Sequence, residues 1–536
     1  MPLLSNSREY KKRELLTCLF LFIAALIPRL VLLDVHPPGL WYDEAINGLD
    51  ALSMIKDGPK IFFTTENHPR EPLYMYFIAF FYLFLPPTIF VLRAVSGILG
   101  ALTIPAVYGL IRRISRDRKL ALVSAIILLF MRWHIHHSRL ALRAVLVPLW
   151  FTLVLWAFCT AVDRKSKKRW ALAGVIFGLG SYTHLAFRFA PFVFLFPLIY
   201  YLKKGMLQFK RDSHLFGIFL LSAFLVFLPL GIDYLLHPFH FFGRMKEVSL
   251  FGEGIASGIS TIVNNVVAVI LMFSFKGDQN PLLNLPGAPV FHPLYSVFFY
   301  LGVITCIVRF RRSVLPIMMF SWMTIMFLPT ILSSGAPHFA RSLGASVPAA
   351  VFVSVGIVES YEWFYDFFRN KAAVLITVIV IIVGSSWNIH LYFMRYRGNM
   401  NLWNRSNAAW VQCGRKALSI SEEGNVVYLP TDMYYHPSVK YVMLNKKSRL
   451  VRPLSFPECL TDQFPETAMD HVILTTSLNR LLPLLKKEIP SGVVISVAET
   501  PEGMQYGWFY LIPERDLMTK EEAASFTNRY NPPEHY

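Results

Sequence analysis

The chain has 536 residues, of which 54% are hydrophobic and only 16% are charged. A soluble protein carries roughly 25% charged residues, so the composition excludes an ordinary soluble enzyme. The formal net charge of +18 comes largely from short basic blocks between apolar runs, as in the cytoplasmic loops of membrane proteins. The sequence therefore indicates a polytopic α-helical membrane protein and gives no reason to expect a nucleic-acid partner.

A basic segment, residues 8–13, precedes the apolar run 15–33, which is too long for the hydrophobic core of a signal peptide. We predict an uncleaved first transmembrane helix with its N-terminus in the cytoplasm. Because positive loops stay in the cytoplasm, the later basic blocks fix the rest of the topology. These blocks are residues 112–119, 164–169, 203–211, 309–312 and 369–371.

The apolar segment 73–85 is too short to cross a bilayer core of about 30 Å, so we expect an interfacial or re-entrant helix there. The other apolar runs predict about eleven crossings, which makes the fold class a polytopic helical membrane protein. The predicted crossings are residues 15–33, 91–111, 119–133, 144–162, 171–187, 189–202, 215–236, 293–308, 313–332, 343–361 and 372–394. The run 261–275 could be interfacial or could span, which would change the count.

Two domains are predicted. Residues 1–394 form the membrane domain, and an odd number of crossings places residues 395–536 outside the cell membrane as a soluble extracytoplasmic domain. Short apolar runs at 426–429, 472–474 and 493–495 predict a small α/β fold for this second domain.

The first outer loop, residues 34–90, carries many carboxylates close to the membrane surface, which makes it a candidate functional segment. Asp43 and Glu44 are adjacent, and apolar residues recur after them at helical spacing as far as Gly58. Asp43 could simply be the N-cap of this amphipathic helix. Its place ten residues beyond the first apolar run favours a catalytic base, with Glu44 orienting Asp43 or the acceptor.

Several arginines lie at the predicted outer ends of helices, where the positive-inside rule disfavours them. Guanidinium groups suit phosphate recognition, so the set predicts a cavity for a lipid phosphate, although any single arginine could extend to lipid headgroups. The candidate substrate-binding residues are His68, Arg93, Arg139, Arg143, Arg188, His338 and Arg341. The histidines of the run 134–137 could hold a metal, but anchoring at the membrane interface is their more ordinary role.

The motifs together resemble the GT-C membrane glycosyltransferases, in particular the protein O-mannosyltransferases and the aminoarabinose transferases that modify lipid A. The resemblance rests on the acidic pair in the first outer loop, the His-Pro-x-x-Pro-Leu-Tyr stretch from His68 and the arginine that opens the next helix. Supporting stretches are residues 137–143, 180–191, 275–287 and 336–348, and the likeness covers about residues 10–395. The chain departs from the family pattern at Arg70 and Glu71, which are inserted, and at Arg143, where mannosyltransferases often have aspartate.

The resemblance implies an inverting glycosyltransferase that moves a hexosyl or pentosyl group from a polyprenyl- or dolichyl-phosphate carrier to an acceptor hydroxyl on the outer face. The acid at Asp43 would be the base. No cofactor is required by this reaction, and a divalent metal is compatible with the sequence without being indicated by it. The expected partners are the lipid-linked sugar donor and membrane lipids, with a glycan, lipid or protein as acceptor.

Two alternatives stay open. A transporter or flippase of lipid-linked sugars would use the same outer arginines but would need ionisable residues near the helix midplanes, which most predicted helix centres lack. A non-enzymatic membrane scaffold would leave the acids of the first outer loop unexplained.

Overall fold

The computed structural model describes residues 2–64, 69–247, 250, 255–309, 313–368, 371–444, 450–454, 458–460, 470–476, 481–513, 517, 518 and 522. The chain divides into two compact units. Unit 1 comprises Met1–Leu33, Asp50–Phe81 and Arg93–Gly398, and unit 2 comprises Asp34–Leu49, Tyr82–Leu92 and Asn399–Tyr536. The domain boundary at residues 394 and 395 stays a prediction from the sequence.

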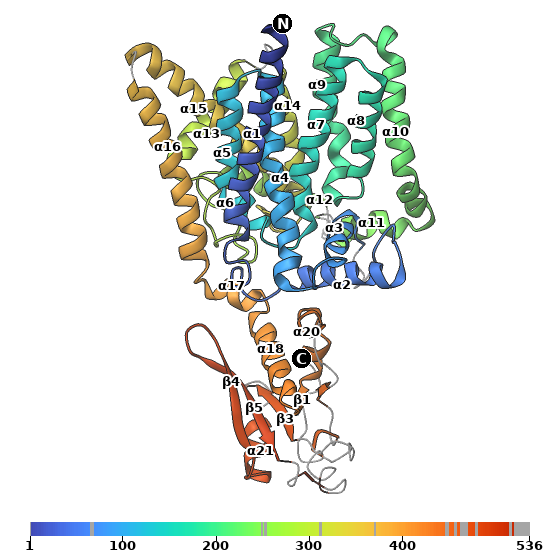
Figure 1. Ribbon diagram of the computed structural model, residues 1–536, viewed down its shortest axis with the longest axis vertical. Coiled ribbons are helices and arrows are strands. Elements are labelled where there is room, and N and C mark those ends of the chain that lie inside the picture. Colours follow the sequence, from blue (N-terminus) through green and yellow to red (C-terminus); the bar gives the residue numbers. More distant parts are fainter. Residues whose placement is uncertain are drawn as a thin grey trace. The chain divides into compact units, whose positions relative to one another are not determined.

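The long apolar runs form helices, most of them close to their predicted bounds (Figure 1). Exceptions include the helix predicted at 15–33, which begins at Pro2, and the one predicted at 171–187, which ends at Gly180. Up to the end of unit 1 the helices are α1 (Pro2–Leu30), α2 (Tyr42–Asp57), α3 (Leu73–Tyr82), α4 (Ile89–Ser115), α5 (Arg118–Phe130), α6 (Arg132–His137), α7 (Leu146–Arg164), α8 (Lys167–Gly180), α9 (Ala190–Lys203), α10 (Phe209–Leu236), α11 (Pro238–Glu247), α12 (Ile255–Leu271), α13 (Pro293–Val308), α14 (Val314–Ile331), α15 (Ser346–Phe368) and α16 (Lys371–His390). Short 3-10 turns precede α7, α9 and α15.

Among the described residues, seven helical stretches are long and apolar enough to cross a membrane, which makes the chain a multi-pass membrane protein. The α3 helix has ten residues, and at 1.5 Å per residue it is too short to span, as expected for the segment 73–85. The α12 helix is apolar but only 17 residues long, and the total of eleven crossings stays a prediction.

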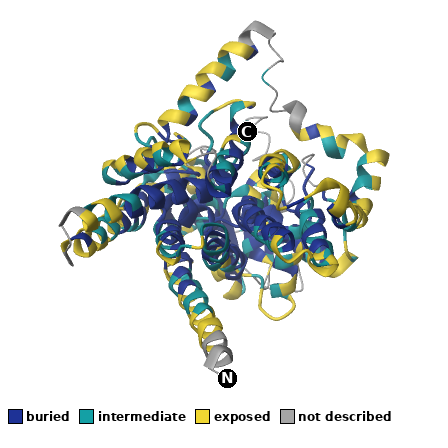
Figure 2. Cartoon of the chain, turned by 90° about the horizontal axis from the view of Figure 1, so that it is seen from above, coloured by how far each residue is buried: buried dark blue, intermediate teal, exposed yellow. Residues whose placement is uncertain are grey.

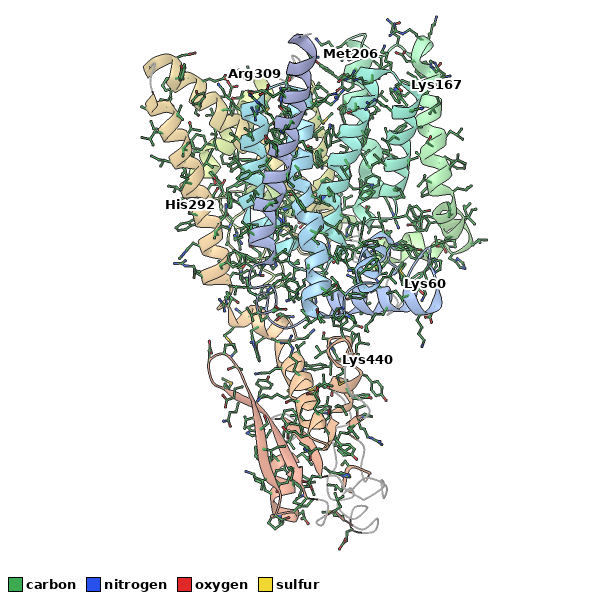
Figure 3. All side chains as sticks on the ribbon, viewed as in Figure 1. Lys60, Lys167, Met206, His292, Arg309 and Lys440 are labelled. Carbon is green, nitrogen blue, oxygen red and sulfur yellow. The ribbon has the colours of Figure 1, made fainter. Side chains whose placement is uncertain are left out.

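The basic blocks of unit 1 gather at one end of its helix bundle. Figure 3 places Lys167, Met206 and Arg309 at the end where α1 begins, and Lys60 at the opposite end. The positive-inside rule predicts that the first of these ends faces the cytoplasm.

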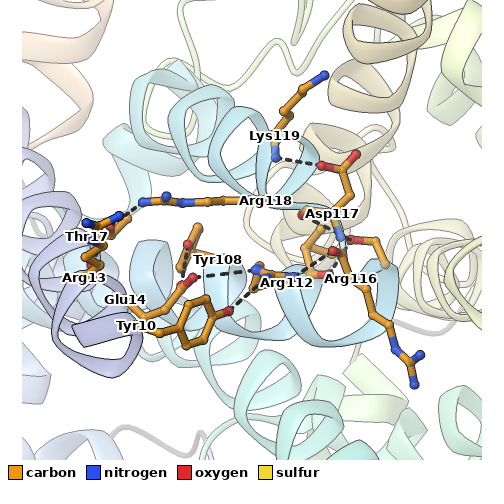
Figure 4. A network of polar contacts seen from close by, with 12 residues as sticks. Tyr10, Arg13, Glu14, Thr17, Tyr108, Arg112, Arg116, Asp117, Arg118 and Lys119 are labelled. Carbon is orange, nitrogen blue, oxygen red and sulfur yellow. Dashed lines mark hydrogen bonds and ion pairs between the residues drawn. The ribbon is translucent and has the colours of Figure 1, made fainter. Parts of the chain in front are cut away.

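Polar contacts tie α1 to α4 at the basic end of unit 1 (Figure 4). The hydroxyl of Tyr108 on α4 donates to the carboxylate of Glu14 on α1 at 2.5 Å. Arg112 on α4 donates to the hydroxyl of Tyr10 on α1 at 2.8 Å. These side chains fix the ends of two apolar helices whose sides offer mainly van der Waals packing.

Within unit 1 the packing distinguishes central from peripheral helices. The α7 and α15 helices are mostly buried, whereas α10 and α16 are strongly apolar over most of their length and mostly exposed, as Figure 2 shows in yellow around the dark blue interior. An apolar helix with little protein around it is typical of a lipid-facing segment. Glycines allow the closest contact of the interior, because a Cβ at Gly302 of α13 or at Gly356 of α15 would meet the backbone of the other helix.

Unit 2 contains a mixed five-stranded sheet covered on both faces. Its further elements are α17 (Met400–Arg405), α18 (Ala408–Glu422), β1 (Val426–Leu429), α19 (Thr431–Tyr435), α20 (Pro437–Met443), β2 (Val451–Pro453), β3 (His471–Thr476), α21 (Leu481–Glu488), β4 (Val493–Glu499) and β5 (Gln505–Ile512). The strand order is β2-β1-β3-β5-β4, with β1 parallel to β2 and β3, and β5 antiparallel to β3 and β4.

Alternate residues of β1 enter different cores because side chains point to opposite faces of a strand. Val427 and Leu429 pack with residues of α18 and α20, whereas Val426 and Tyr428 pack with residues of α21. The centre of the sheet around β1 is therefore buried between helices, whereas the edge strand β4 is largely exposed. The small α/β fold expected from the runs at 426–429, 472–474 and 493–495 is confirmed.

Within unit 2 the segment before α2 is attached to the C-terminal helices. The hydroxyl of Ser438 on α20 donates to the carbonyl of Leu40 at 2.7 Å, and the ring of Tyr42 lies edge-on to His436 at 5.4 Å. Gly39 has φ +63°, and a Cβ on it would collide with the backbone of Ser406 and Ala408. The absence of a side chain at Gly39 therefore allows the two chain segments to meet.

We predict that Gly39→Ala destabilises unit 2 by about 1–3 kcal/mol, because it adds a backbone clash to left-handed strain. Gly58→Ala is the matched control, since Gly58 also has positive φ, at +96°, but has open space around it. The measurement is the unfolding temperature of both purified variants. Equal losses at the two positions would show that the close approach at Gly39 contributes nothing.

Candidate functional site

Glu71, in the turn before α3, lies where two arginines from distant parts of unit 1 meet. Its side chain is 3% exposed. Arg143 donates to one carboxylate oxygen at 2.5 Å, and Arg188 approaches the other at 3.5 Å. Arg143 lies at the turn that leads into α7, and Arg188 lies in the turn that precedes α9. One carboxylate thus pairs with two guanidinium groups from different turns.

Arg188 is further held by the corner between α10 and α11. It donates to the backbone carbonyl of Phe241 at 2.5 Å and to the hydroxyl of Tyr234 at 3.2 Å. Its guanidinium also lies over both rings, 4.1 Å from the centroid of Phe241 and 5.2 Å from that of Tyr234. Cation–π contacts of this kind fix the plane of the guanidinium group.

His184 lies in the electric field of these arginines. Its Nδ1 accepts a hydrogen bond from the backbone N–H of Ala186 at 3.1 Å. Burial, followed by the charges of Arg143, Arg188 and Arg244, lowers the pKa of His184 to about 3. The ring is therefore neutral near pH 7, and its proton is on Nε2, which makes that atom a hydrogen-bond donor.

His338 has the same properties. Its Nδ1 accepts from the backbone N–H of Arg341 at 3.3 Å, which leaves the proton of the neutral ring on Nε2. Burial, then Arg341, and more weakly His137 and Arg244, lower the pKa of His338 to about 3. The guanidinium of Arg341 is anchored by the hydroxyl of Ser333 at 2.6 Å.

Arg244 connects the two groups, because its charge acts on His184, His338 and Arg341. We call the set the basic cluster; its members are Arg143, Arg188, Arg244 and Arg341 together with His184 and His338. Glu71 pairs with two of these arginines, and the charge of the buried Asp278 acts on Arg341. The cluster therefore suits an anionic ligand such as a phosphate.

His137 adds an acceptor to this region. Its Nδ1 lies 2.9 Å from the carbonyl of Trp133, so Nδ1 carries the proton of the neutral ring. Burial lowers the pKa of His137 to about 4. Its Nε2 is buried without a hydrogen-bond partner among the described residues, which leaves a lone pair for a ligand hydroxyl.

Two predicted phosphate ligands, Arg93 and Arg139, group instead with Arg29, and all three are fully buried. The charge of Arg93 acts on Arg139, and the charge of Arg139 acts on Arg29. Arg139 donates to the carbonyl of Pro28 at 2.9 Å and lies over the ring of Phe393 at 5.1 Å. Protein groups thus surround Arg139, and its role as a phosphate ligand stays a prediction.

The three histidines of the run 134–137 contact mainly other protein groups. His134 contacts the guanidinium of Arg29 at 2.9 Å, and His136 Nε2 lies 2.8 Å from the carbonyl of Leu282. His137 contacts Trp133, as described above. These contacts orient the three rings in different hydrogen bonds rather than toward a common ion.

The acidic pair lies in unit 2 at the start of α2. Asp43 is the second residue of the helix and is exposed, so it does not occupy the N-cap position. Glu44 is fully buried and accepts from the backbone N–H of Trp41 at 3.1 Å, which satisfies one free N–H at the helix start. The catalytic roles of both acids stay predictions, and His68 lies outside the described residues.

Sequence reasoning did not assign Glu71, His184 and His137 to the site, whereas Arg244 was among the arginines expected at outer helix ends or in outer loops. Glu71 did carry a signal, because it is one of the two residues inserted into the family's motif. The other inserted residue, Arg70, also makes a buried ion pair, with Asp50 at 2.7 Å. His184 and His137 lie in stretches that support the family resemblance, but their hydrogen bonds depend on the folded turns.

We predict that acidification destabilises the protein through His184 and His338. Their pKa is near 3 in the folded chain and about 6.5 when unfolded, so the unfolded state binds protons first. Their contribution is complete above pH 6.5 and falls as the pH drops toward 3. The measurement is unfolding temperature between pH 7.5 and 5.5, where His184→Asn and His338→Asn should flatten the decline. Exposed His214→Asn is the control; an equal slope in all variants would contradict the assignment.

Comparisons with known proteins support the fold. A family model described as dolichyl-phosphate-mannose-protein mannosyltransferase matches residues 67–232, whereas no curated protein sequence matches the chain. ArnT from Cupriavidus metallidurans bound to undecaprenyl phosphate is 12% identical, with a TM-score of 0.54 over 92% of this chain and 97% of ArnT. The archaeal oligosaccharyltransferase AglB from Archaeoglobus fulgidus, in complex with an inhibitory peptide and a dolichol-phosphate, is 15% identical, with a TM-score of 0.51 over 93% of this chain and 74% of AglB.

At these identities the likeness to solved structures concerns the fold, and the family model adds a match in sequence across the first half of the membrane helices. Both agree with the resemblance of the motifs. The chain therefore has the fold of the GT-C superfamily of membrane glycosyltransferases.

Proposed function

We propose that the protein transfers a sugar from a polyprenyl- or dolichyl-phosphate carrier to an acceptor hydroxyl on the outer face of the membrane. The observation that supports this most is the basic cluster, in which Glu71 pairs with both Arg143 and Arg188 and brings their guanidinium groups together. The bound lipid phosphates named for ArnT and AglB belong to those proteins, but they show what ligands this fold can take.

In this reaction the bond between the anomeric carbon and the phosphate oxygen breaks, and the acceptor oxygen bonds to the same carbon from the opposite face. The departing lipid phosphate gains negative charge as it leaves. Guanidinium groups already held in place stabilise this charge without reorganising, which is the most effective form of electrostatic catalysis. The Nε2–H groups of His184 and His338 can donate hydrogen bonds to its oxygens.

The acceptor hydroxyl must lose its proton as the new bond forms, and a carboxylate is the suitable base. We assign this role to Asp43, which is exposed at the start of α2. Glu44 is a weaker candidate, because it is buried and its carboxylate caps the N-terminus of the helix. Its hydrogen bond to Trp41 instead fixes the first turn that carries Asp43.

Turnover of the reconstituted protein with a panel of polyprenyl-phosphate sugars tests this function. The rate of polyprenyl phosphate release should fall about 10²–10⁴-fold in Asp43→Asn, which is the usual effect of losing a general base. Asp57→Asn, at the exposed C-terminal end of the same helix, is the control and should keep wild-type turnover. Redistribution of labelled donor across the membrane without release would contradict the transferase and favour a flippase.

The lipid-phosphate site has its own prediction. Arg188→Lys keeps the charge but loses the planar group that spans Glu71, Tyr234 and Phe241, so KM for the donor should rise about tenfold or more. Arg309→Lys is a matched control, because Arg309 also pairs with a carboxylate, that of Glu359, at the basic end of the bundle. Equal KM values in both variants and the wild type would exclude Arg188 from donor binding.

A further inference from the structure

A cluster of metal-binding side chains lies at the corner between α10 and α11, outside the residues used above. It consists of Asp233, His237 and His240, whose ligand atoms all lie within 4.8 Å of one another. Asp233 lies in the last turn of α10, and His237, four residues on, is the C-cap of that helix, with its Nδ1 near an oxygen of Asp233. The chain turns at Pro238, and the first turn of α11 brings His240 back to the same carboxylate.

The geometry suits a divalent cation. His237 Nδ1 lies 3.3 Å from one oxygen of Asp233, and His240 Nδ1 lies 2.7 Å from the other. Ligand atoms around a tetrahedral zinc ion are about 3.3 Å apart, as follows from metal–ligand distances near 2.0–2.1 Å. The Nδ1 atom of His237 is already at this distance from Oδ1 of Asp233. The Nδ1 atom of His240 would have to move about half an ångström away from Oδ2 of Asp233.

The surroundings fix two ligands and leave access on the third side. Asp233 and His240 are each about one-sixth exposed, at 17% and 15%, and the His240 ring stacks on Phe62 with centroids 4.7 Å apart. The side chain of His237 is 58% exposed, so an ion and a water ligand can approach past it. Two imidazoles and one carboxylate with an open position are ligands that zinc and similar transition metals prefer.

We propose that Asp233, His237 and His240 bind one divalent transition-metal ion of the Zn²⁺ type. The site is coupled to the basic cluster through the chain, because Tyr234 and Phe241 follow two of the ligands directly. These two residues supply the hydroxyl and the carbonyl to which Arg188 donates. Metal binding therefore fixes the corner that positions Arg188; this second role rests on the proposed function, whereas metal binding itself does not.

The first test is binding of Zn²⁺ to the full-length protein after treatment with a chelator and desalting. We expect about one tightly bound equivalent in the wild type, measured by mass spectrometry of the metal, and at least tenfold weaker binding in Asp233→Asn and His237→Ala. The side chain of His237 is 58% exposed and contacts the ring of His240, so its removal takes away little buried surface. His214→Ala changes an exposed histidine on the same helix and should bind like the wild type.

Absence of a tight Zn²⁺ site in the wild type, or unchanged affinity in Asp233→Asn and His237→Ala, would overturn the proposal. Neither result depends on turnover, so the metal site can fail while the glycosyltransferase function stands. The effect of the metal on the position of Arg188 is tested by measuring KM for the donor. This KM should rise in His237→Ala, and it should rise equally in the wild type when the metal has been removed. An unchanged KM in the presence of a confirmed metal site would exclude that role.

Discussion

The ion pairs of Glu71 are the constraint on which the candidate site depends. Arg143 and Arg188 arrive from turns before different helices, and two guanidinium groups repel each other when they are brought together in a poorly solvated place. A carboxylate that is 3% exposed compensates one of these charges and allows both side chains to stay. Removal of such a partner usually costs several kcal/mol, because it leaves buried charge behind. Burial and then the same charges keep His184 neutral, and the hydrogen bond from Ala186 to Nδ1 leaves its proton on Nε2.

The acidic motif depends on the C-terminal part of the chain. Within unit 2 the segment before α2 is held by a hydrogen bond from Ser438 to the carbonyl of Leu40 and by the close approach at Gly39. Tyr441 of α20 likewise donates to the carbonyl of Thr88 at 3.1 Å and contacts the hydroxyl of Tyr82. A catalytic group must be held still to be useful, so these contacts give residues 399–536 a physical role if Asp43 is the base that we propose.

Patterns that are local in sequence predicted most of the fold. Apolar runs marked the long helices, and the short run after residue 73 gave a short helix because its length limits it. His338 and Arg341 were both among the predicted substrate-binding residues, and they lie three positions apart in the sequence. The partnership of Glu71 was beyond such reasoning, because Arg143 and Arg188 are 72 and 117 residues away and burial decides whether an ion pair forms. The grouping of residues 34–49 with the C-terminal segments is equally non-local.

The central claim is that the basic cluster binds a lipid phosphate. The most direct measurement is native mass spectrometry of the protein with undecaprenyl phosphate, which counts bound lipid without requiring an acceptor. The account predicts one specifically bound lipid that is lost when Arg244 and Arg341 are both replaced by glutamine and kept when Arg309 is replaced. Equal retention of the lipid in both variants would contradict the account, because the phosphate would then be held elsewhere.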